Sequence, residues 1–439
     1  MTSFASTDLL LSCFQTAGRV TTDTRQLQAG DLYFALKGDR FDGNQFVAQA
    51  IAQGASFAVT DDPALATHER VLLVEDTLLA LQQLATAWRR LFNIPLLAIT
   101  GSNGKTTTKE LVASVLSKAH KTHFTQGNLN NHIGVPLTLL AMPRDTEIAV
   151  IEMGANHQRE IAMLCRIAEP THGLITNIGK AHLEGFGGQE GIKIGKGELY
   201  EWLAASKGVA FINMEEPFLH DMATERKVEK RIGYKISDQP QLTIPYYEVQ
   251  LRALFPTVTT AFLDHHGALH ECESHLAGRH NLHNIITAIA VGKYFKVPTL
   301  QIIAAIGQYN PSNNRSQWLH KDGIAWFMDA YNANPSSMQV ALLAFKQLPG
   351  DRKVVVLGDM LELGEEAAAE HEAIARLALE QAFEQVVLVG DLFSEIAARL
   401  GIDHFPSAAA LTTNWDKNNW QGAQVMVKGS RGMKLETII

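Results

Sequence analysis

The sequence predicts an α/β protein of three domains, and two observations support this prediction. The chain has 439 residues, of which 46% are hydrophobic and 19% charged, which is enough for about three globular domains of ordinary size. From residue 96 onward, short apolar runs alternate with amphipathic helical segments. This alternation is typical of βαβ units around a mostly parallel sheet.

The first predicted domain covers residues 1–93 and is a small α/β unit. Strand-like and helical patterns alternate along it, at residues 31–36, 46–52, 57–59 and 78–92. The last of these helical patterns ends at Asn93-Ile94-Pro95, because the residue before a proline is biased away from helix. We therefore place the first domain boundary there.

The second predicted domain covers residues 94–310 and contains a parallel sheet. Buried strands with helical segments between them are predicted at residues 96–100, 148–151, 173–176 and 209–212. Between residues 242 and 277 the pattern changes to short alternating runs, which predicts a small added β-sheet built as a hairpin. The mixed-charge stretch at residues 226–231 is interpreted as the solvated face of a helix.

The third predicted domain covers residues 311–439 and is a Rossmann-like α/β unit. Apolar runs separated by helical segments predict its strands at residues 325–328, 353–357, 386–389 and 424–427.

Charge and cysteine content argue against several classes of protein. The formal net charge is -8, with no long basic run, which argues against nucleic-acid binding. No stretch approaches the ~20 apolar residues of a membrane span, and the first residues lack the charge and apolar core of a signal peptide. The three cysteines, Cys13, Cys165 and Cys272, are far apart, which favours free thiols in the cytoplasm.

The strongest motif is a strand, a glycine-rich loop and a helix between residues 96 and 116. Gly101 and Gly104 allow the N–H groups of the loop to converge, and the helix N-terminus adds a partial positive charge. Lys105 would reach the outer phosphates of a bound triphosphate, and the Thr106 hydroxyl would ligate their Mg²⁺. The predicted phosphate site comprises Gly101, Ser102, Asn103, Gly104, Lys105, Thr106 and Thr107.

Three further side chains follow predicted strands or begin a helix and are candidates for the same site. Glu152 ends a strand, where it would either ligate the Mg²⁺ held by Thr106 or serve as a surface or helix-capping residue. His182 follows the next strand and is either a metal ligand or a hydrogen-bonded structural residue. Lys196 lies at a glycine-rich helix start and, taken alone, reads as a surface lysine.

Taken together, these motifs resemble the ATP-dependent Mur ligases of bacterial peptidoglycan synthesis. The resemblance rests on residues 101–107, 127–136, 151–155, 178–187 and 278–284. Three later stretches are most similar to the members that add D-alanyl-D-alanine to a UDP-N-acetylmuramoyl-tripeptide, namely residues 329–335, 357–364 and 427–433. Five positions at motif edges depart from the usual pattern, namely Thr24, Asn44, Met328, Ala330 and Gly432.

The resemblance implies ATP and Mg²⁺ as cofactors and a set of catalytic residues. In this family the lysine that matches Lys196 is carbamylated by CO₂, and the resulting carboxylate helps to hold a second Mg²⁺ beside a histidine that matches His182. The expected catalytic residues are Lys105, Lys196 and His182, and the expected metal ligands are Thr106, Glu152, His182 and Lys196. Asn281 and Asn284 would lie at the adenine, and Arg315 and Asp329 would approach the nucleotide from the third domain.

The resemblance also implies two small-molecule substrates. Thr24, Arg25 and Asp42 resemble the elements that receive the UDP end of the nucleotide sugar. The other expected substrate-binding residues are Asn130, Asn131, Asn332 and Asn334. The protein is expected to act as a monomer.

The expected reaction is ATP-dependent amide formation through an acyl phosphate, giving a UDP-N-acetylmuramoyl-pentapeptide. Two alternatives stay open. One is a ligase of the same family that adds another group, such as a diamino acid, or glutamate onto folate. The other is a regulatory protein that binds ATP without turnover, although such a sensor needs only some of the catalytic residues that this chain retains.

Overall fold

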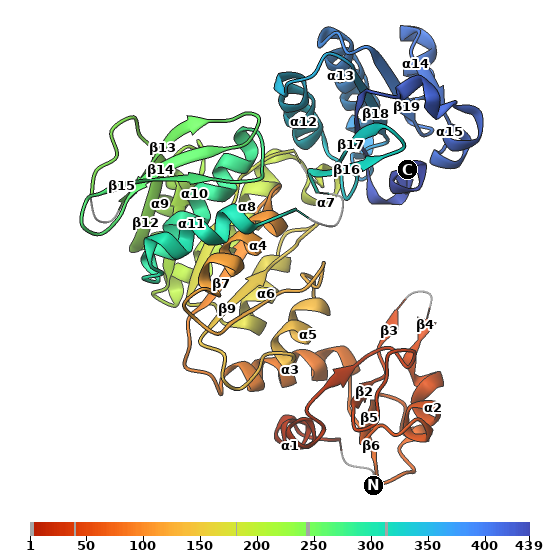
Figure 1. Ribbon diagram of the computed structural model, residues 1–439. Helices are drawn as coiled ribbons and strands as arrows, with labels where there is room; N and C mark the ends of the chain where they lie inside the picture. The colour runs from red at the N-terminus through yellow and green to blue at the C-terminus, as the bar shows by residue number, and fades with distance from the viewer. Residues whose placement is uncertain (1–3, 39–40, 181, 243–245, 312–314) are drawn as a thin grey trace.

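Three large β-sheets follow one another along the chain, as the computed structural model in Figure 1 shows. The structure describes residues 4–38, 41–180, 182–242, 246–311 and 315–439. The first sheet lies at the bottom of the view and the third at the top, with the second and largest between them. The predicted α/β architecture of three units is thus confirmed.

The N-terminal sheet has four parallel strands in the order β1-β2-β5-β6. Its strands and helices are α1 (Thr7–Ala17), β1 (Val20–Thr21), β2 (Leu32–Phe34), α2 (Val47–Ala52), β5 (Phe57–Thr60), β6 (Val71–Leu73) and α3 (Thr77–Arg89), with a hairpin of β3 (Lys37–Gly38) and β4 (Phe41–Asp42). Helix α3 joins this unit to the next, because the buried Arg89 guanidinium donates to the backbone carbonyls of Phe92 and Ala168.

The central sheet has nine strands in the order β15-β14-β13-β12-β11-β10-β7-β9-β8. Its strands are β7 (Leu96–Thr100), β8 (Thr122–Phe124), β9 (Ile148–Glu152), β10 (His172–Ile175), β11 (Val209–Asn213), β12 (Lys230–Ile236), β13 (Tyr246–Ala253), β14 (Thr259–Leu263) and β15 (Leu269–Glu273). All neighbours from β8 to β13 are parallel, whereas β14 and β15 are added antiparallel. The predicted hairpin addition is therefore confirmed, and it extends the edge of the parallel sheet.

Eight helices of the described chain cover this sheet, namely α4 (Lys105–Leu116), α5 (Gly134–Leu140), α6 (Glu160–Ala168), α7 (Leu183–Phe186), α8 (Gln189–Ala205), α9 (Leu219–Glu225), α10 (Arg279–Tyr294) and α11 (Thr299–Gln308). The prediction of a helix at residues 226–231 is wrong, because α9 ends at Glu225 and β12 begins at Lys230. Backbone pairing of β12 with both β11 and β13 outweighs the local charge pattern there.

The C-terminal sheet has six strands in the order β16-β17-β21-β18-β19-β20. Its strands are β16 (Gln317–Lys321), β17 (Ile324–Met328), β18 (Lys353–Gly358), β19 (Gln385–Val389), β20 (Asp403–Phe405) and β21 (Gln424–Lys428), and its helices are α12 (Pro335–Gln347), α13 (Ala367–Glu380), α14 (Ser394–Leu400) and α15 (Ala408–Asn414). Only the β16–β17 pair is antiparallel among these described strands. The four predicted strands correspond to β17, β18, β19 and β21.

The parallel order of the central sheet positions the candidate site. On β7, Leu96 and Ala98 face one buried layer while Leu97 and Ile99 face the other, which explains the continuous apolar run. Because β7, β9, β10 and β11 are parallel, their carboxyl ends meet at one edge of the sheet, where ligands of such folds bind.

Among the described residues, no helix has both the length and the apolarity that a membrane crossing requires.

Candidate active site

The phosphate loop follows β7 directly and is shaped by two glycines. Gly101 has φ 137°, and a Cβ there would lie 2.0 Å from the Thr176 hydroxyl. Gly104 has φ 77° and precedes α4, and a Cβ there would lie 2.7 Å from the Asn284 side-chain oxygen. Both positions therefore require glycine, because each has a positive φ and a Cβ would collide with the side chain of Thr176 or Asn284. The Thr176 hydroxyl in turn donates to the Asn103 carbonyl at 2.6 Å and holds the loop.

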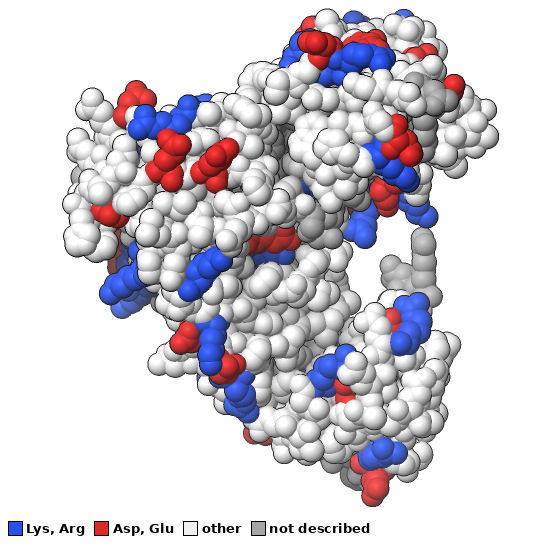
Figure 2. Space-filling view, viewed as in Figure 1, with Lys and Arg blue, Asp and Glu red and all other residues white. Residues whose placement is uncertain are grey.

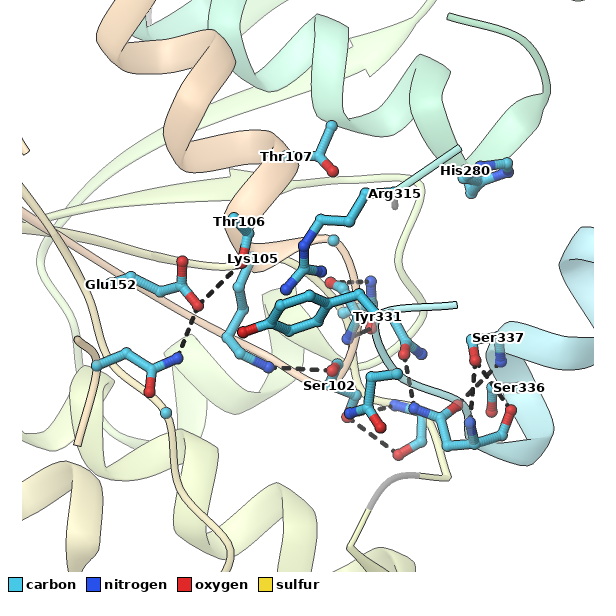
Figure 3. Close-up of a pocket in the computed structure, with 18 of the residues that line it drawn as sticks. Ser102, Lys105, Thr106, Thr107, Glu152, His280, Arg315, Tyr331, Ser336 and Ser337 are labelled. Carbon is cyan, nitrogen blue, oxygen red and sulfur yellow. Dashed lines mark hydrogen bonds between the residues drawn. The ribbon is translucent and has the colours of Figure 1, made fainter. Parts of the chain in front are cut away.

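Lys105 is the first residue of α4 and folds back onto its own loop. Its ammonium group donates to the carbonyl of Gly101 at 2.7 Å and to that of Ser102 at 3.1 Å, the second of which is drawn in Figure 3. Burial lowers the pKa of Lys105 to about 8; the Glu152 carboxylate opposes this shift, and the nearby Arg315 charge adds to it. The side chain is therefore charged at neutral pH without a carboxylate in contact, as a phosphate-binding lysine requires.

Glu152 ends β9 and lies opposite the first turn of α4. One of its carboxylate oxygens accepts from the Thr106 hydroxyl at 3.2 Å and from the Asn130 amide at 2.8 Å. The other oxygen is buried and has no hydrogen-bond partner among the described residues. A buried carboxylate oxygen with no partner, beside a hydroxyl, is a donor set that suits Mg²⁺.

Lys196 lies on α8 and is 1% exposed. Its amine donates to the Ala155 carbonyl at 3.0 Å and lies 4.8 Å from the centre of the Phe186 ring. Burial, with the Lys105 charge as a further cause, lowers the pKa of Lys196 well below its ordinary value. The interpretation of Lys196 as a surface lysine is therefore wrong, because α8 packs it into the core.

His182 lies in the loop before α7 and contacts the C-terminal unit. Its Nδ1 forms a hydrogen bond with the Glu362 carboxylate, and its backbone is left-handed with φ 54°. Among the described residues, no group of three or more His, Cys, Asp and Glu side chains gathers in a way that could hold a metal ion. A metal site at His182 therefore depends on ligands of other types, such as Thr106 and a modified Lys196.

Helix α10 and the C-terminal unit close the other side of the site. The Thr108 hydroxyl donates to Asn284 at 2.9 Å, and Asn284 donates to Asn281 at 3.2 Å, so α10 lies directly against α4. The Arg315 guanidinium stacks on the Tyr331 ring with 3.8 Å to its centre (Figure 3). Asp329 accepts from the Lys428 ammonium at 2.6 Å.

One cavity of about 770 Å³, which we call the main cavity, gathers most of the predicted residues. Those that line it are Ser102, Asn103, Gly104, Lys105, Thr106, Thr107, Asn130, Asn131, Glu152, His182, Asn281, Asn284, Arg315, Asp329, Asn332 and Asn334. This volume falls in the range of about 300–1,000 Å³ that is typical of small-molecule sites. Gly101 and Lys196 do not line the cavity.

The predicted residues of the N-terminal unit lie apart from the main cavity. Arg25 pairs with Asp23 at 2.8 Å and its side chain is 88% exposed. The Asp42 carboxylate accepts from the Asn44 backbone N–H at 3.0 Å and caps a short 3₁₀ helix, Gly43–Phe46. Thr24 lies next to Arg25 in the same loop. The structure therefore does not bring Thr24, Arg25 and Asp42 together with the phosphate loop.

Several residues of the site were not predicted. Asn177 accepts from the Asn103 backbone N–H at 3.0 Å and holds the phosphate loop, and its place directly after a strand was a usable signal. Burial raises the pKa of Glu216 to about 7 and lowers that of His280 to about 4, and both line the main cavity. No motif marks Glu216, since only the packing of the loop after β11 brings it there.

Comparison with known proteins identifies the family. Residues 17–89 match the model described as "Mur ligase family, catalytic domain", residues 99–292 the "Mur ligase middle domain", and residues 314–431 the "Mur ligase, glutamate ligase domain". The UDP-N-acetylmuramoyl-tripeptide--D-alanyl-D-alanine ligase of Bacillus subtilis is 35% identical, covering 96% of this chain and 92% of the relative. The enzyme of the same name from Escherichia coli is 34% identical, over 97% and 93%.

Solved structures agree with these sequence matches. MurF from Acinetobacter baumannii has a TM-score of 0.86 and 31% identity, covering 98% of this chain and 97% of that one. MurF ligase from Thermotoga maritima in complex with ADP has a TM-score of 0.79 and 26% identity, covering 96% of each chain. With its phosphate loop, its cavity and these relatives, the chain belongs to the Mur ligase family.

Proposed function

We infer that this chain joins D-alanyl-D-alanine to a UDP-N-acetylmuramoyl-tripeptide in an ATP-dependent reaction that gives the pentapeptide precursor of peptidoglycan. Relatives of that name share 30–36% identity with most of the chain. The observation that carries the inference is the main cavity, whose lining includes the phosphate loop of the central unit and Asp329, Asn332 and Asn334 of the C-terminal unit.

The reaction needs an activated carboxylate, because amide formation from a carboxylate and an amine in water runs uphill. The terminal carboxylate of the tripeptide attacks the γ-phosphorus of ATP, which forms an acyl phosphate and releases ADP. The amine of D-alanyl-D-alanine, after losing a proton, then attacks the acyl carbon and expels phosphate. Lys105 offsets the repulsion between the carboxylate and the triphosphate, and the N–H groups at the start of α4 bind the phosphates.

We further propose that Thr106 and Glu152 hold Mg²⁺. The unpartnered buried oxygen of Glu152 supports this, since a divalent cation would satisfy it. When bound, Mg²⁺ would neutralise phosphate charge and orient the triphosphate. His182 would contribute to a second metal position once its side chain leaves Glu362.

We propose that Lys196 is carbamylated, because its amine is buried and has a lowered pKa. Only an uncharged amine reacts with CO₂, and burial lowers the pKa of Lys196 well below its ordinary value, which favours the uncharged form. The buried surroundings of the Lys196 amine, which contacts the Ala155 carbonyl and the Phe186 ring, would also shield the product from water. The carbamate would add a carboxylate close to the proposed metal ligands.

The remaining assignments concern the substrates and the whole chain. We propose that Thr24, Arg25 and Asp42 receive the UDP end of the nucleotide sugar, while Asn130, Asn131, Asn332 and Asn334 contact its peptide or the acceptor. Asn281, Asn284, Arg315 and Asp329 would hold the nucleotide. Domain boundaries at residues 93/94 and 310/311, a monomeric state and a cytoplasmic location are proposed with them.

The test is mass spectrometry of the products formed from ATP, Mg²⁺, UDP-N-acetylmuramoyl-tripeptide and a mixture of D-alanyl-D-alanine, single amino acids and glutamate. We expect the nucleotide sugar to gain one D-alanyl-D-alanine minus water, with ADP and phosphate formed in step. Addition of another group would refute this specificity, and ATP binding without any joining would refute the ligase activity.

A further inference from the structure

One carboxylate of the main cavity, that of Glu216, has no role in the proposed mechanism. Glu216 lies in the loop after β11 and lines the cavity. Within the described residues, its carboxylate forms no hydrogen bond and no ion pair. Burial raises the pKa of Glu216 to about 7, so the ionised carboxylate is poorly hydrated. Such a group without a partner is unfavourable, which indicates that a hydrogen-bond donor of a ligand completes it.

Hydrogen bonds hold the loop that carries Glu216 against helix α10. The side-chain amide of Asn213 forms a hydrogen bond with the Nδ1 of His283 at 3.0 Å. The side-chain oxygen of Asn213 accepts from the Glu215 N–H at 3.1 Å, and its backbone carbonyl accepts from the Glu216 N–H at 3.3 Å. The place of Glu216 in the cavity is therefore set by the helix whose Asn284 borders the phosphate loop.

The strand order separates Glu216 from the phosphate loop. The loop after β11 lies two strands away from β7, because β10 pairs with both strands. Neighbouring strands lie about 4.8 Å apart, so this loop is roughly 10 Å from the phosphate loop. A carboxylate repels phosphates but not an uncharged base. The part of a bound nucleotide that suits the surroundings of Glu216 is therefore the base.

We propose that Glu216 accepts a hydrogen bond from the 6-amino group of adenine and so contributes to the selection of ATP. This inference rests on the proposed function and assigns it a specificity-determining residue. The 6-amino group is the hydrogen-bond donor that adenine offers. An ionised carboxylate only accepts, so it matches this group and repels the 6-oxo oxygen of other purines. The amides of Asn281 and Asn284 both donate and accept, so they discriminate less.

The test measures nucleotide binding to the full-length protein by titration calorimetry in the presence of Mg²⁺. ATP is compared with purine riboside triphosphate, which lacks only the 6-amino group. We expect the wild type to bind the analogue with a Kd about 10- to 100-fold higher than that of ATP, since a hydrogen bond to a charged group contributes this much. Glu216→Ala should raise the Kd of ATP by a similar factor without raising that of the analogue, so that it binds both nucleotides alike.

Two further variants make the comparison specific. Glu216→Gln keeps a side-chain carbonyl that can accept from the amino group without a charge, so we expect it to retain part of the preference for ATP. Glu215→Ala is the matched control, because Glu215 is exposed, does not line the main cavity and removes the same charge. We expect this control to bind both nucleotides as the wild type does.

The outcomes separate this inference from the proposed function. If Glu216→Ala weakens the binding of both nucleotides equally, or of neither, the assignment of Glu216 is overturned while ATP binding by the wild type still stands. If the wild type binds no ATP, the proposed function fails and this inference fails with it. A general loss of stability affects both nucleotides alike, so it cannot imitate a loss that is confined to ATP.

Discussion

At the scale of single residues, the site has two lysines whose burial destabilises the charged ammonium form. Burial lowers the pKa of both Lys105 and Lys196, with different consequences for the two side chains. Lys105, with a pKa of about 8, still carries its charge at neutral pH and can bind phosphate. For Lys196 burial lowers the pKa well below its ordinary value, which favours the uncharged amine that covalent modification requires. The same physical cause therefore supports two different proposed roles.

The shifted pKa of Lys105 predicts how ATP binding depends on pH. Below about pH 8 the lysine is charged both with and without ATP, so the Kd stays level. Above it, the free protein has lost the proton that the phosphates require, so binding must take one up and the Kd rises by up to about tenfold per pH unit. Calorimetric titration between pH 7 and 9.5 measures this, and Lys105→Met should bind more weakly with no such rise. A level Kd in the wild type would contradict the prediction.

Removal of the Glu152 charge predicts a change in the need for Mg²⁺. Glu152→Gln keeps the size of the side chain but places a neutral amide where the unpartnered carboxylate oxygen lies. We expect the Mg²⁺ concentration for half-maximal activity to rise by about 10- to 100-fold, as is usual when a metal site loses a supporting group. Glu147→Gln, an exposed carboxylate just before β9, is the control. An unchanged Mg²⁺ requirement would contradict the assignment of Glu152 as a Mg²⁺ ligand.

At the scale of elements, the sequence predicted the strands near the site more completely than those at the sheet edges. The strand before the phosphate loop is an apolar run buried on both faces, and such runs are recognisable locally. The short strands β1, β16 and β20 were not predicted, because two to five residues at an edge carry little periodicity of their own. Their pairing partners are what make them strands.

Close packing around the phosphate loop predicts that replacing Gly101 destabilises the protein more than replacing Gly127, which lies outside the loop. Gly127 has φ 55° and open space around it, so Gly127→Ala should cost only about 1 kcal/mol of unfolding free energy. Gly101→Ala adds a clash with Thr176 and should cost about 2–4 kcal/mol. Denaturant unfolding of the two variants measures the difference. Equal costs would show that the loop is free to move away from β10.

At the scale of the whole molecule, polar contacts inside and outside the main cavity hold the central and C-terminal units together. The Asn334 amide donates to Asn103 at 2.8 Å, and Lys180 pairs with Glu370 at 2.5 Å. The N-terminal unit is different, since Figure 2 shows open space between it and the C-terminal unit. The proposed UDP site lies outside the main cavity, on the unit that faces this open space, which leaves room for closure around the substrates.

This arrangement predicts compaction on binding. Small-angle scattering should show a smaller radius of gyration when ATP and the UDP-linked tripeptide are both present, because closure excludes water from the acyl phosphate. Either ligand alone should give a smaller change, since each contacts fewer of the units. A radius that is the same with both ligands and with none would contradict closure.

The sequence by itself determined the α/β class, the phosphate loop and the family, because each depends on residues close together in the chain. Apolar periodicity and the spacing of Gly101, Gly104 and Lys105 are properties of short stretches, so they can be recognised in the sequence alone. Only the tertiary structure decided that Lys196 is buried, that His182 contacts Glu362, and that Glu216 lines the main cavity. Those facts depend on contacts between residues far apart in the chain, and a shift of one packed element would change each of them.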